Sequence, residues 1–224
     1  PSSTPVVLRS AGFSDGFIVN CDAQGNLLPT LYFPRLRSDL KRYTGIAVAN
    51  WGKTPADVEF TAFDDSGSKT TQPSGVTNPK TLTIPAGGQV AMLATQIFSL
   101  PSDQPGSGWA QAQGTSSQLA GFFLEGGTDL SYLDGAVAGN SSSKELFFTR
   151  GPVGSEIVGN SAYENRIDVV NPNPVSARID LKLLNQFGVI QETATRVLGP
   201  LGRMSEELTS LFPSMPGSVT KGYI

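Results

Sequence analysis

Asp57-Val-Glu-Phe-Thr-Ala-Phe63 alternates polar and apolar residues, which places Val58, Phe60 and Ala62 on one face of an extended chain. Alternation with a period of two is typical of a strand with one face on a hydrophobic core and the other in water. Another stretch, Arg178-Ile-Asp-Leu-Lys-Leu-Leu184, repeats the pattern. Strands that are buried on one face only are typical of antiparallel sheets, so the pattern predicts an all-β fold.

The two stretches belong to a longer internal repeat. Residues 44–67 align with residues 165–188 without a gap, 121 positions apart. Blocks within residues 82–109 align with blocks within residues 196–223, 114 positions apart. The change from 121 to 114 predicts a hairpin that is seven residues shorter in the second copy, and the excess of the first copy falls in the loop-like residues 71–79. The sequence therefore predicts two tandem antiparallel β-sandwich repeats.

Each copy is expected to contain one short helical turn. The turns are expected at Leu93–Phe98 and at Glu206–Phe212, the second with Ser205 as its N-cap. Glu207 would then lie, like Glu206, in the first helical turn, where the helix dipole favours negative charge. With about seven short strands in a complete copy, the pattern suits an immunoglobulin-like sandwich.

These patterns divide the chain into three parts. We expect an N-terminal strand segment at 1–29, a first sandwich repeat at 30–143 and a second at 144–224. The second copy is expected to lack its last strands, because it contains no counterparts of residues 119–124 and 132–137.

The N-terminal segment contains candidate replacement strands. Ala11, Gly12 and Phe13 resemble Ala120, Gly121 and Phe122, and Phe17, Ile18 and Val19 form a further apolar run. A sandwich that lacks strands exposes open backbone edges, so we expect a donated strand to complete the second copy. Three sources stay open: the segment folds back, it completes a neighbouring molecule, or the chain is a slice of a longer array of repeats.

The amino-acid composition argues against several kinds of binding partner and of catalytic or metal site. The net charge is −3 without a basic stripe, and no apolar run approaches the roughly 18 residues of a membrane helix, so neither a nucleic-acid partner nor a membrane span is expected. Histidine is absent and the single cysteine, Cys21, allows no internal disulfide. We therefore predict no catalytic residue, no metal site, no cofactor and no enzyme activity. We interpret the one small basic cluster as a solvated loop; it consists of Arg35, Arg37, Lys41 and Arg42.

The aligned blocks resemble repeats of uncharacterised secreted bacterial proteins that are similar to immunoglobulin-like or fibronectin-like sandwiches. The stretches that carry the resemblance are Tyr43–Asn50, Thr54–Asp64, Leu82–Ala91 and Leu119–Phe122. The resemblance implies an extracellular or cell-surface location and carries no catalytic residue.

Duplicated sandwiches without a catalytic constellation favour a non-catalytic structural or adhesive module, self-assembling through β-strand complementation or joining neighbouring repeats by strand addition. The alternative is a carbohydrate- or surface-binding module of a larger secreted protein, with a glycan as ligand. Trp51 is the candidate ligand contact, because it aligns with Pro172 and is specific to the first copy. Trp109 aligns with Tyr223, which predicts a packing role in both copies.

Overall fold

The computed structural model divides the chain into two compact units, residues 1–142 and residues 143–224, called here the first and the second unit. The predicted boundary between 143 and 144 lies beside this division. The structure describes residues 30–71, 74–101, 106–116, 118–140, 143, 145–148, 166–214 and 222–224, and the backbone of four short strands at 6–8, 17–19, 157–158 and 161–162.

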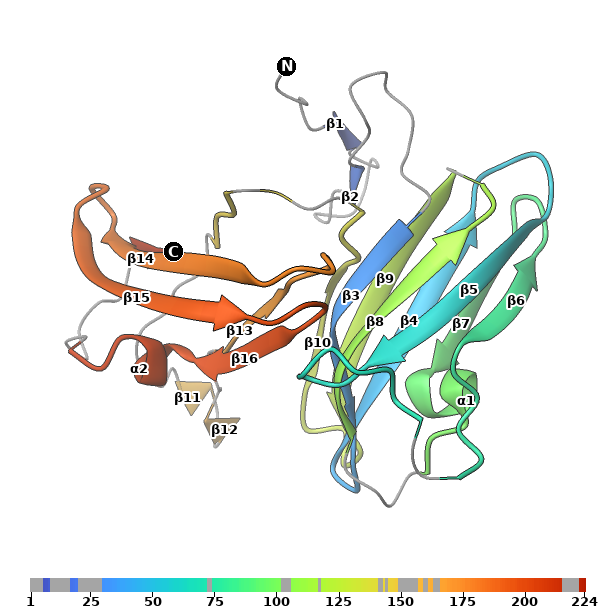
Figure 1. The fold of residues 1–224 in the computed structure, drawn as a ribbon, viewed down its shortest axis with the longest axis horizontal. Coiled ribbons are helices and arrows are strands. Elements are labelled where there is room, and N and C mark those ends of the chain that lie inside the picture. The colour runs from blue at the N-terminus through green and yellow to red at the C-terminus, as the bar shows by residue number, and fades with distance from the viewer. Residues whose placement is uncertain are drawn as a thin grey trace. The chain divides into compact units, whose positions relative to one another are not determined.

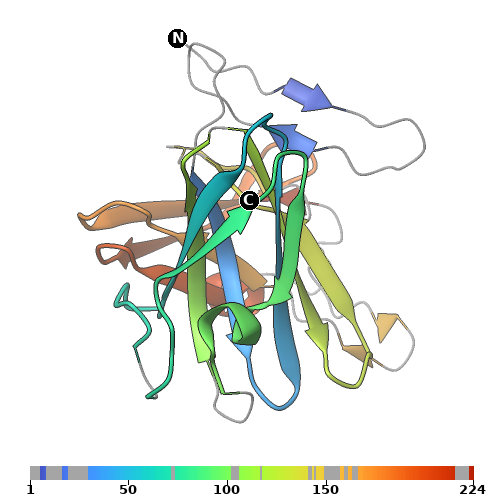
Figure 2. The same ribbon diagram turned by 90° about the vertical axis from the view of Figure 1, so that its right-hand side faces the viewer.

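The first unit is built from two four-stranded antiparallel sheets, with strand orders β10-β9-β4-β7 and β3-β8-β5-β6 (Figures 1 and 2). The strands of these sheets, and the helix α1 between two of them, are β3 (Thr30–Ser38), β4 (Arg42–Asn50), β5 (Ala56–Phe63), β6 (Lys80–Ile84), β7 (Gln89–Leu93), α1 (Ala94–Phe98), β8 (Gly106–Gly114), β9 (Leu119–Gly127) and β10 (Leu133–Val137). The predicted all-β fold with antiparallel sheets is confirmed. That the units are copies of one immunoglobulin-like sandwich stays a prediction.

The core of the first unit follows from the alternation along β5. Val58, Phe60 and Ala62, predicted to share one face, are all buried in one hydrophobic cluster. The same cluster takes Phe33 from β3 and Phe123 from β9, whose rings meet edge to face with centroids 6.4 Å apart. Burying one large apolar side chain contributes about 1.5–3 kcal/mol, so the contacts in this cluster help to hold the two sheets together.

Two features of the strand pairing in the first unit follow from single residues. The β3–β8 register shifts between Phe33 and Leu36, around Pro34, which has no N–H for the ladder. On β8, a Cβ at Gly108 would lie 1.9 Å from the Phe63 carbonyl oxygen, so only glycine fits there. The next residue, Trp109, stacks on the Phe63 ring with centroids 4.5 Å apart, which confirms its packing role.

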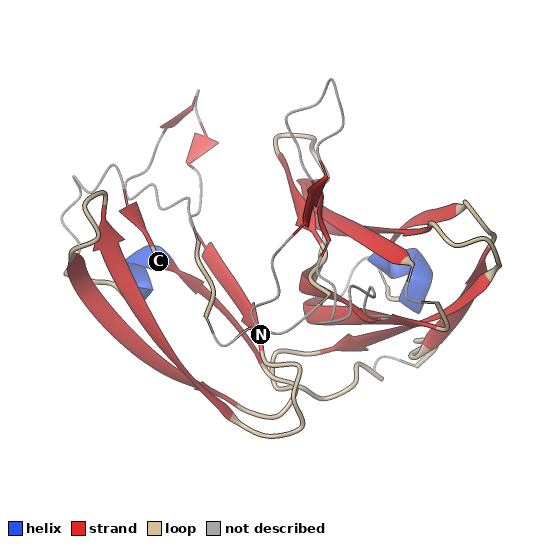
Figure 3. Ribbon diagram, turned by 90° about the horizontal axis from the view of Figure 1, so that it is seen from above, coloured by secondary structure: helices blue, strands red, loops and turns tan. Residues whose placement is uncertain are grey.

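The second unit also forms antiparallel sheets, with strand orders β13-β16 and β15-β14-β17. Its elements are β11 (Ile157–Val158), β12 (Ser161–Ala162), β13 (Arg166–Val170), β14 (Ala177–Asn185), β15 (Ile190–Leu198), β16 (Arg203–Glu207), α2 (Leu208–Leu211) and β17 (Gly222–Tyr223). Leu181 and Leu183 of β14, Met204 of β16 and Phe212 after α2 are buried together in its core. Strands dominate both units, and the helices are short (Figure 3).

The two helical turns follow β7 and β16. The first, α1, confirms the expected turn at Leu93–Phe98. The second is shorter than expected, and the placement of Glu206 and Glu207 in its first turn, with Ser205 as N-cap, is wrong. All three residues lie on β16, where Glu206 pairs with Ile167 of β13, because the backbone ladder continues to the end of this strand.

A membrane-spanning helix is not found in the part of the chain that the structure describes, since α1 and α2 are far too short to cross a bilayer.

Candidate interaction surfaces

A buried asparagine anchors the turn that follows β4. Asn50 is 1% exposed, and its Oδ1 accepts a hydrogen bond from the Gly52 backbone N–H at 2.9 Å. Its Nδ2 donates at 2.8, 3.1 and 3.2 Å to the carbonyl oxygens of Thr54, Ile84 and Pro85. One side chain therefore satisfies buried backbone groups of the turn and ties the turn to the end of β6.

Asn171 makes the corresponding bonds in the second unit. Its Nδ2 donates to the carbonyl oxygens of Val175 and Gly199, both at 2.8 Å. Its Oδ1 accepts a hydrogen bond from the Asn173 N–H at 3.2 Å. Each of these partners lies at the position that the alignment of the two copies assigns to it.

Trp51 lies in the turn that Asn50 anchors, and it is 69% exposed. Its backbone N–H donates to the Gln118 carbonyl oxygen at 2.9 Å, which fixes the base of an exposed indole. The corresponding turn of the second unit has Pro172 at this position and keeps the bonds of its asparagine. The fold therefore does not require an aromatic residue here, and the role of Trp51 as a ligand contact stays a prediction.

The turn after β5 and the turn after β14 share one geometry. The Asp64 Oδ1 accepts hydrogen bonds from the N–H groups of Ser66 and Ser68, at 2.9 and 3.0 Å. The Asn185 Oδ1 accepts them from Phe187 and Val189, at 2.9 and 3.1 Å. Both turns contain a glycine with positive φ, as the sequence predicts. A carboxylate and an amide are interchangeable in this role, since each offers the same acceptor oxygen.

The side chains that these two turns present to solvent differ in kind. The first unit exposes Ser66 and Ser68, whereas the second exposes Phe187, by 79%, and Val189, by 56%. Ile190, the first residue of β15, is also half exposed. The turn geometry does not need these apolar groups, so the β14–β15 hairpin carries an apolar tip, defined here as Phe187, Val189 and Ile190. Only the alignment of the two turns could have singled out this tip from the sequence.

The tip leads into a long edge strand. β15 is the outermost strand in the order β15-β14-β17, and its outer side has no partner strand among the described residues. It has nine residues, whereas β6, the edge strand at the aligned place in the first unit, has five. The strand contains neither proline nor lysine, which commonly protect sheet edges from pairing with another chain, although it has a β-bulge near its start and two inward-pointing charged residues, Glu192 and Arg196.

Charged groups line the inner face of β15. The Arg196 Nε and Nη2 donate to the two carboxylate oxygens of Glu206, both at 2.7 Å. This hydrogen bonding lowers the pKa of Glu206 below its ordinary value, although burial opposes it. Glu192 lies four residues before Arg196, on the same face of β15. It accepts one long hydrogen bond of 3.4 Å from the Ser214 N–H. Its other oxygen, Oε2, is buried and has no hydrogen-bond partner among the described residues.

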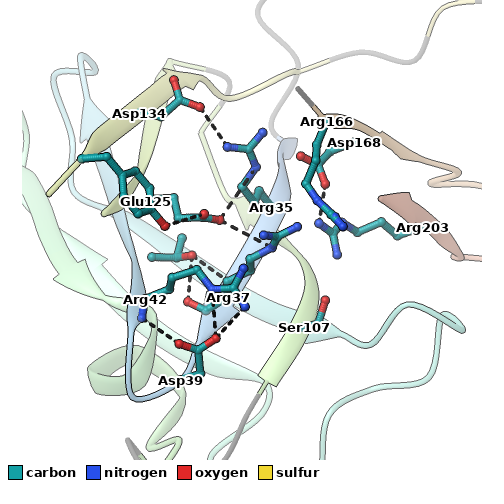
Figure 4. A network of polar contacts seen from close by, with 12 residues as sticks. Arg35, Arg37, Asp39, Arg42, Ser107, Glu125, Asp134, Arg166, Asp168 and Arg203 are labelled. Atoms are coloured by element: carbon teal, nitrogen blue, oxygen red, sulfur yellow. Dashed lines mark hydrogen bonds and ion pairs between the residues drawn. The ribbon is translucent and has the colours of Figure 1, made fainter. Parts of the chain in front are cut away.

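A buried carboxylate organises the polar contacts of the first unit (Figure 4). Glu125 of β9 is 5% exposed, and its Oε2 lies 3.6 Å from the Arg37 Nε and 3.9 Å from the Arg35 Nε. Its Oε1 accepts a hydrogen bond from the Tyr132 hydroxyl at 3.0 Å. Burial first, and then the charge of Glu125, raise the pKa of Tyr132 to about 12, so this phenol stays a donor. Arg35 also donates to Asp134 of β10 at 2.9 Å, and the cluster therefore links β3, β9 and β10.

The interpretation of the basic cluster as a solvated loop is wrong for three of its members. Arg35 and Arg37 lie on β3 and pair with carboxylates, because β3 continues to Ser38 in register with β8. Arg42 begins β4 and donates to the Asp39 Oδ2 at 3.0 Å. Lys41 alone lies in the turn, where its N–H donates to the Asp39 Oδ1 at 2.8 Å. Burial acts to raise the pKa of Asp39, but these hydrogen bonds lower it below its ordinary value.

The predicted strand donor is described only in part. Phe17, Ile18 and Val19 form β2 (Phe17–Val19), which pairs antiparallel with β1 (Val6–Leu8). Ala11, Gly12, Phe13 and Cys21 lie outside the described residues. Donation of this segment to a sandwich stays a prediction.

In the described ranges, no group of three or more histidine, cysteine, aspartate or glutamate residues is placed to hold a metal ion.

No protein-family model matches the sequence, and no curated protein matches it. One solved structure, the crystal structure of Thermotoga maritima 1070, is similar with a TM-score of 0.39 and 13% sequence identity. The similarity covers 52% of this chain and 99% of that protein.

Proposed function

We propose that this chain is a non-catalytic structural or adhesive module of a secreted or cell-surface protein, and that it self-assembles by β-strand addition through β15. The observation that carries the proposal is the outer edge of β15, a nine-residue strand without a partner strand among the described residues that begins at the apolar tip. The module consists of two copies of one immunoglobulin-like sandwich.

The paired turns support the proposal that the two units are copies. Asn50 and Asn171 hold their turns with corresponding hydrogen bonds, as do Asp64 and Asn185. The aligned positions that differ in kind are solvent-exposed, such as Ser66 and Phe187. A shared scaffold with divergent exposed residues is expected of a structural unit that was duplicated and then adapted at its surface.

The physical argument for assembly concerns the backbone. An unpaired edge presents a row of N–H and C=O groups that a further strand satisfies, and the resulting bonds need no particular side chain. The apolar tip adds surface that water solvates poorly, at about 25 cal/mol for each Å² that assembly would bury. In the first unit, β6 is shorter and follows a hairpin loop that is seven residues longer than its counterpart in the second unit.

Mass measurements test the proposal directly. Size-exclusion chromatography with light scattering, over a range of concentrations, should show assemblies of the full chain. Thr193→Lys with Thr195→Lys places like charges along the β15 edge and should return the mass to one chain. The matched control, Thr81→Lys with Thr83→Lys on β6, should leave the assembly unchanged. A single-chain mass at every concentration, or equal assembly by both double variants, would overturn the proposal.

The N-terminal segment is the other source of a strand. Deleting residues 1–28 should leave assembly intact if β15 carries it. Loss of assembly in the deletion, together with normal assembly of the β15 lysine variant, would overturn assembly through β15 and favour the predicted donor segment.

A carbohydrate-binding function is the second candidate, and the exposure of Trp51 favours it. An exposed indole on a fixed turn can stack on the apolar face of a sugar ring, as aromatic side chains at interfaces do. We expect Trp51→Ala to abolish any binding found on a glycan array while leaving the mass of the protein unchanged. Glycan binding that survives this substitution would contradict the assignment.

A further inference from the structure

The charges on β15 point to its partner. We propose that β15 pairs antiparallel with β15 of a second copy of this chain, about a two-fold axis that passes through Ala194. This inference rests on the proposed function and adds to it the identity and register of the added strand. Two identical edge strands that run antiparallel form a self-complementary interface, which closes as a dimer.

The register follows from charge complementarity along the inner face of β15. With the axis at Ala194, Glu192 lies opposite Arg196 of the second copy, and Arg196 lies opposite Glu192 of that copy. Residues directly opposite each other on antiparallel strands have Cβ atoms about 4.5–5.5 Å apart, and opposite charges there stabilise the pair. A register centred on Glu192 or on Arg196 would place like charges in contact instead.

The bonding state of the two side chains agrees with this register. The Glu192 Oε2 is buried without a hydrogen-bond partner among the described residues, which is costly for a carboxylate oxygen. Arg196 bonds to Glu206 and to the Thr195 carbonyl oxygen with its Nε, Nη2 and Nη1. A guanidinium has five N–H donors, so Arg196 keeps donors for a second carboxylate. Because the Glu192 Oε2 is already buried within its own chain, this side chain has to turn toward the edge to meet Arg196 of the second copy.

The outer face of β15 also matches its symmetry mate. Thr193 lies opposite Thr195 of the second copy, a pairing that favours cross-strand contact. Toward the apolar tip the regular pairing ends at Glu192, because the register to β14 shifts between Leu183 and Leu184 and leaves Gln191 as an extra residue on β15. The interface would continue the three-stranded sheet β15-β14-β17 into six strands.

Cross-linking tests the register. Identical residues on the axis have Cα atoms about 4.5–5.5 Å apart, which is within the span of a disulfide. In a Cys21→Ser background, Ala194→Cys should form a disulfide-linked dimer under mild oxidation. The control Val197→Cys is exposed on the same strand, but its mate would lie about 20 Å away along the edge. Failure of Ala194→Cys to cross-link, or faster cross-linking of Val197→Cys, would overturn the register.

A charge exchange separates this inference from the proposed function. Thr193→Glu with Thr195→Lys places each new glutamate opposite a new lysine of the second copy. Within the hairpin the new side chains face Lys182 and Asp180, which are of opposite charge to them. This variant should keep the dimer that Thr193→Lys with Thr195→Lys loses. If the lysine variant abolishes assembly and the charge-exchange variant does not restore it, the register is refuted and assembly through β15 stands. A wild-type protein with the mass of a single chain would refute both the register and assembly through β15.

Discussion

Replacing Asn50 by alanine should destabilise the first unit without changing its surface. The substitution removes an acceptor bonded to Gly52 and an amide group bonded to three carbonyl oxygens. Because the amide has only two hydrogens, the loss amounts to about three hydrogen bonds, each with a net contribution of about 1 kcal/mol. The free energy of unfolding of the first unit should therefore fall by about 3 kcal/mol, which for a unit of 142 residues lowers Tm by roughly 10 °C.

Tryptophan fluorescence is the appropriate assay, because both tryptophans, Trp51 and Trp109, lie in the first unit and report its unfolding in urea. Asn50→Asp is the second variant, since it keeps the size and the acceptor but turns a charged oxygen toward three carbonyl oxygens. It should lose at least as much stability as alanine. Trp51→Ala, an exposed control assayed by circular dichroism, should change stability by less than about 0.5 kcal/mol. A loss below about 1 kcal/mol for Asn50→Ala, or a fully stable Asn50→Asp, would refute the role of this side chain.

Two further changes test the packing of one unit and the electrostatics of the other. Gly121→Val should cost the first unit about 1–3 kcal/mol in urea unfolding, because the new Cβ would lie 3.0 Å from the Leu31 Cδ1. Gly139→Ala, with nothing within 4 Å, is the control, and equal losses would count against the packing argument. The pKa of Glu206 in the folded protein lies below its ordinary value. Its bond to Arg196 therefore stabilises the fold at pH values above the pKa of the unfolded state, and this stabilisation is lost as the pH falls through the pKa of the folded state. Glu206→Gln should thus lower stability by about 0.5–1 kcal/mol near neutral pH and by less in acid, measured by circular dichroism in urea; a pH-independent difference would contradict this.

The strands of the first unit could be predicted because their side chains alternate. Val58, Phe60 and Ala62 lie on the core face as the pattern requires. The end of β16 was harder, since Glu206 and Glu207 before an apolar run satisfy the local rules for a helix start. The antiparallel ladder to β13 decides their conformation, and long-range pairing of this kind leaves no local signal.

Most features of the candidate interaction surfaces could not be predicted from sequence patterns. Arg35 and Arg37 cluster in sequence as loop residues do, and their partner Glu125 is distant along the chain, so neither their strand nor their ion pairs could be inferred. The edge position of β15 likewise depends on the strand order of the whole sheet. Trp51, which the structure shows exposed, could be singled out because the aligned copy supplied a comparison, Pro172.

The different length of one hairpin in the two units has a consequence for how such a chain can change over generations. The described residues of 71–79 lie outside the hydrophobic core cluster, and lengthening such a loop costs little, with each doubling adding about 0.6 kcal/mol. Under the proposed assembly through β15, a chain made of such units could convert a solitary sandwich into a joining one, or the reverse, by an insertion or deletion at one hairpin. Adhesion would then be a property that mutation can add or remove at the periphery while the buried architecture stays the same.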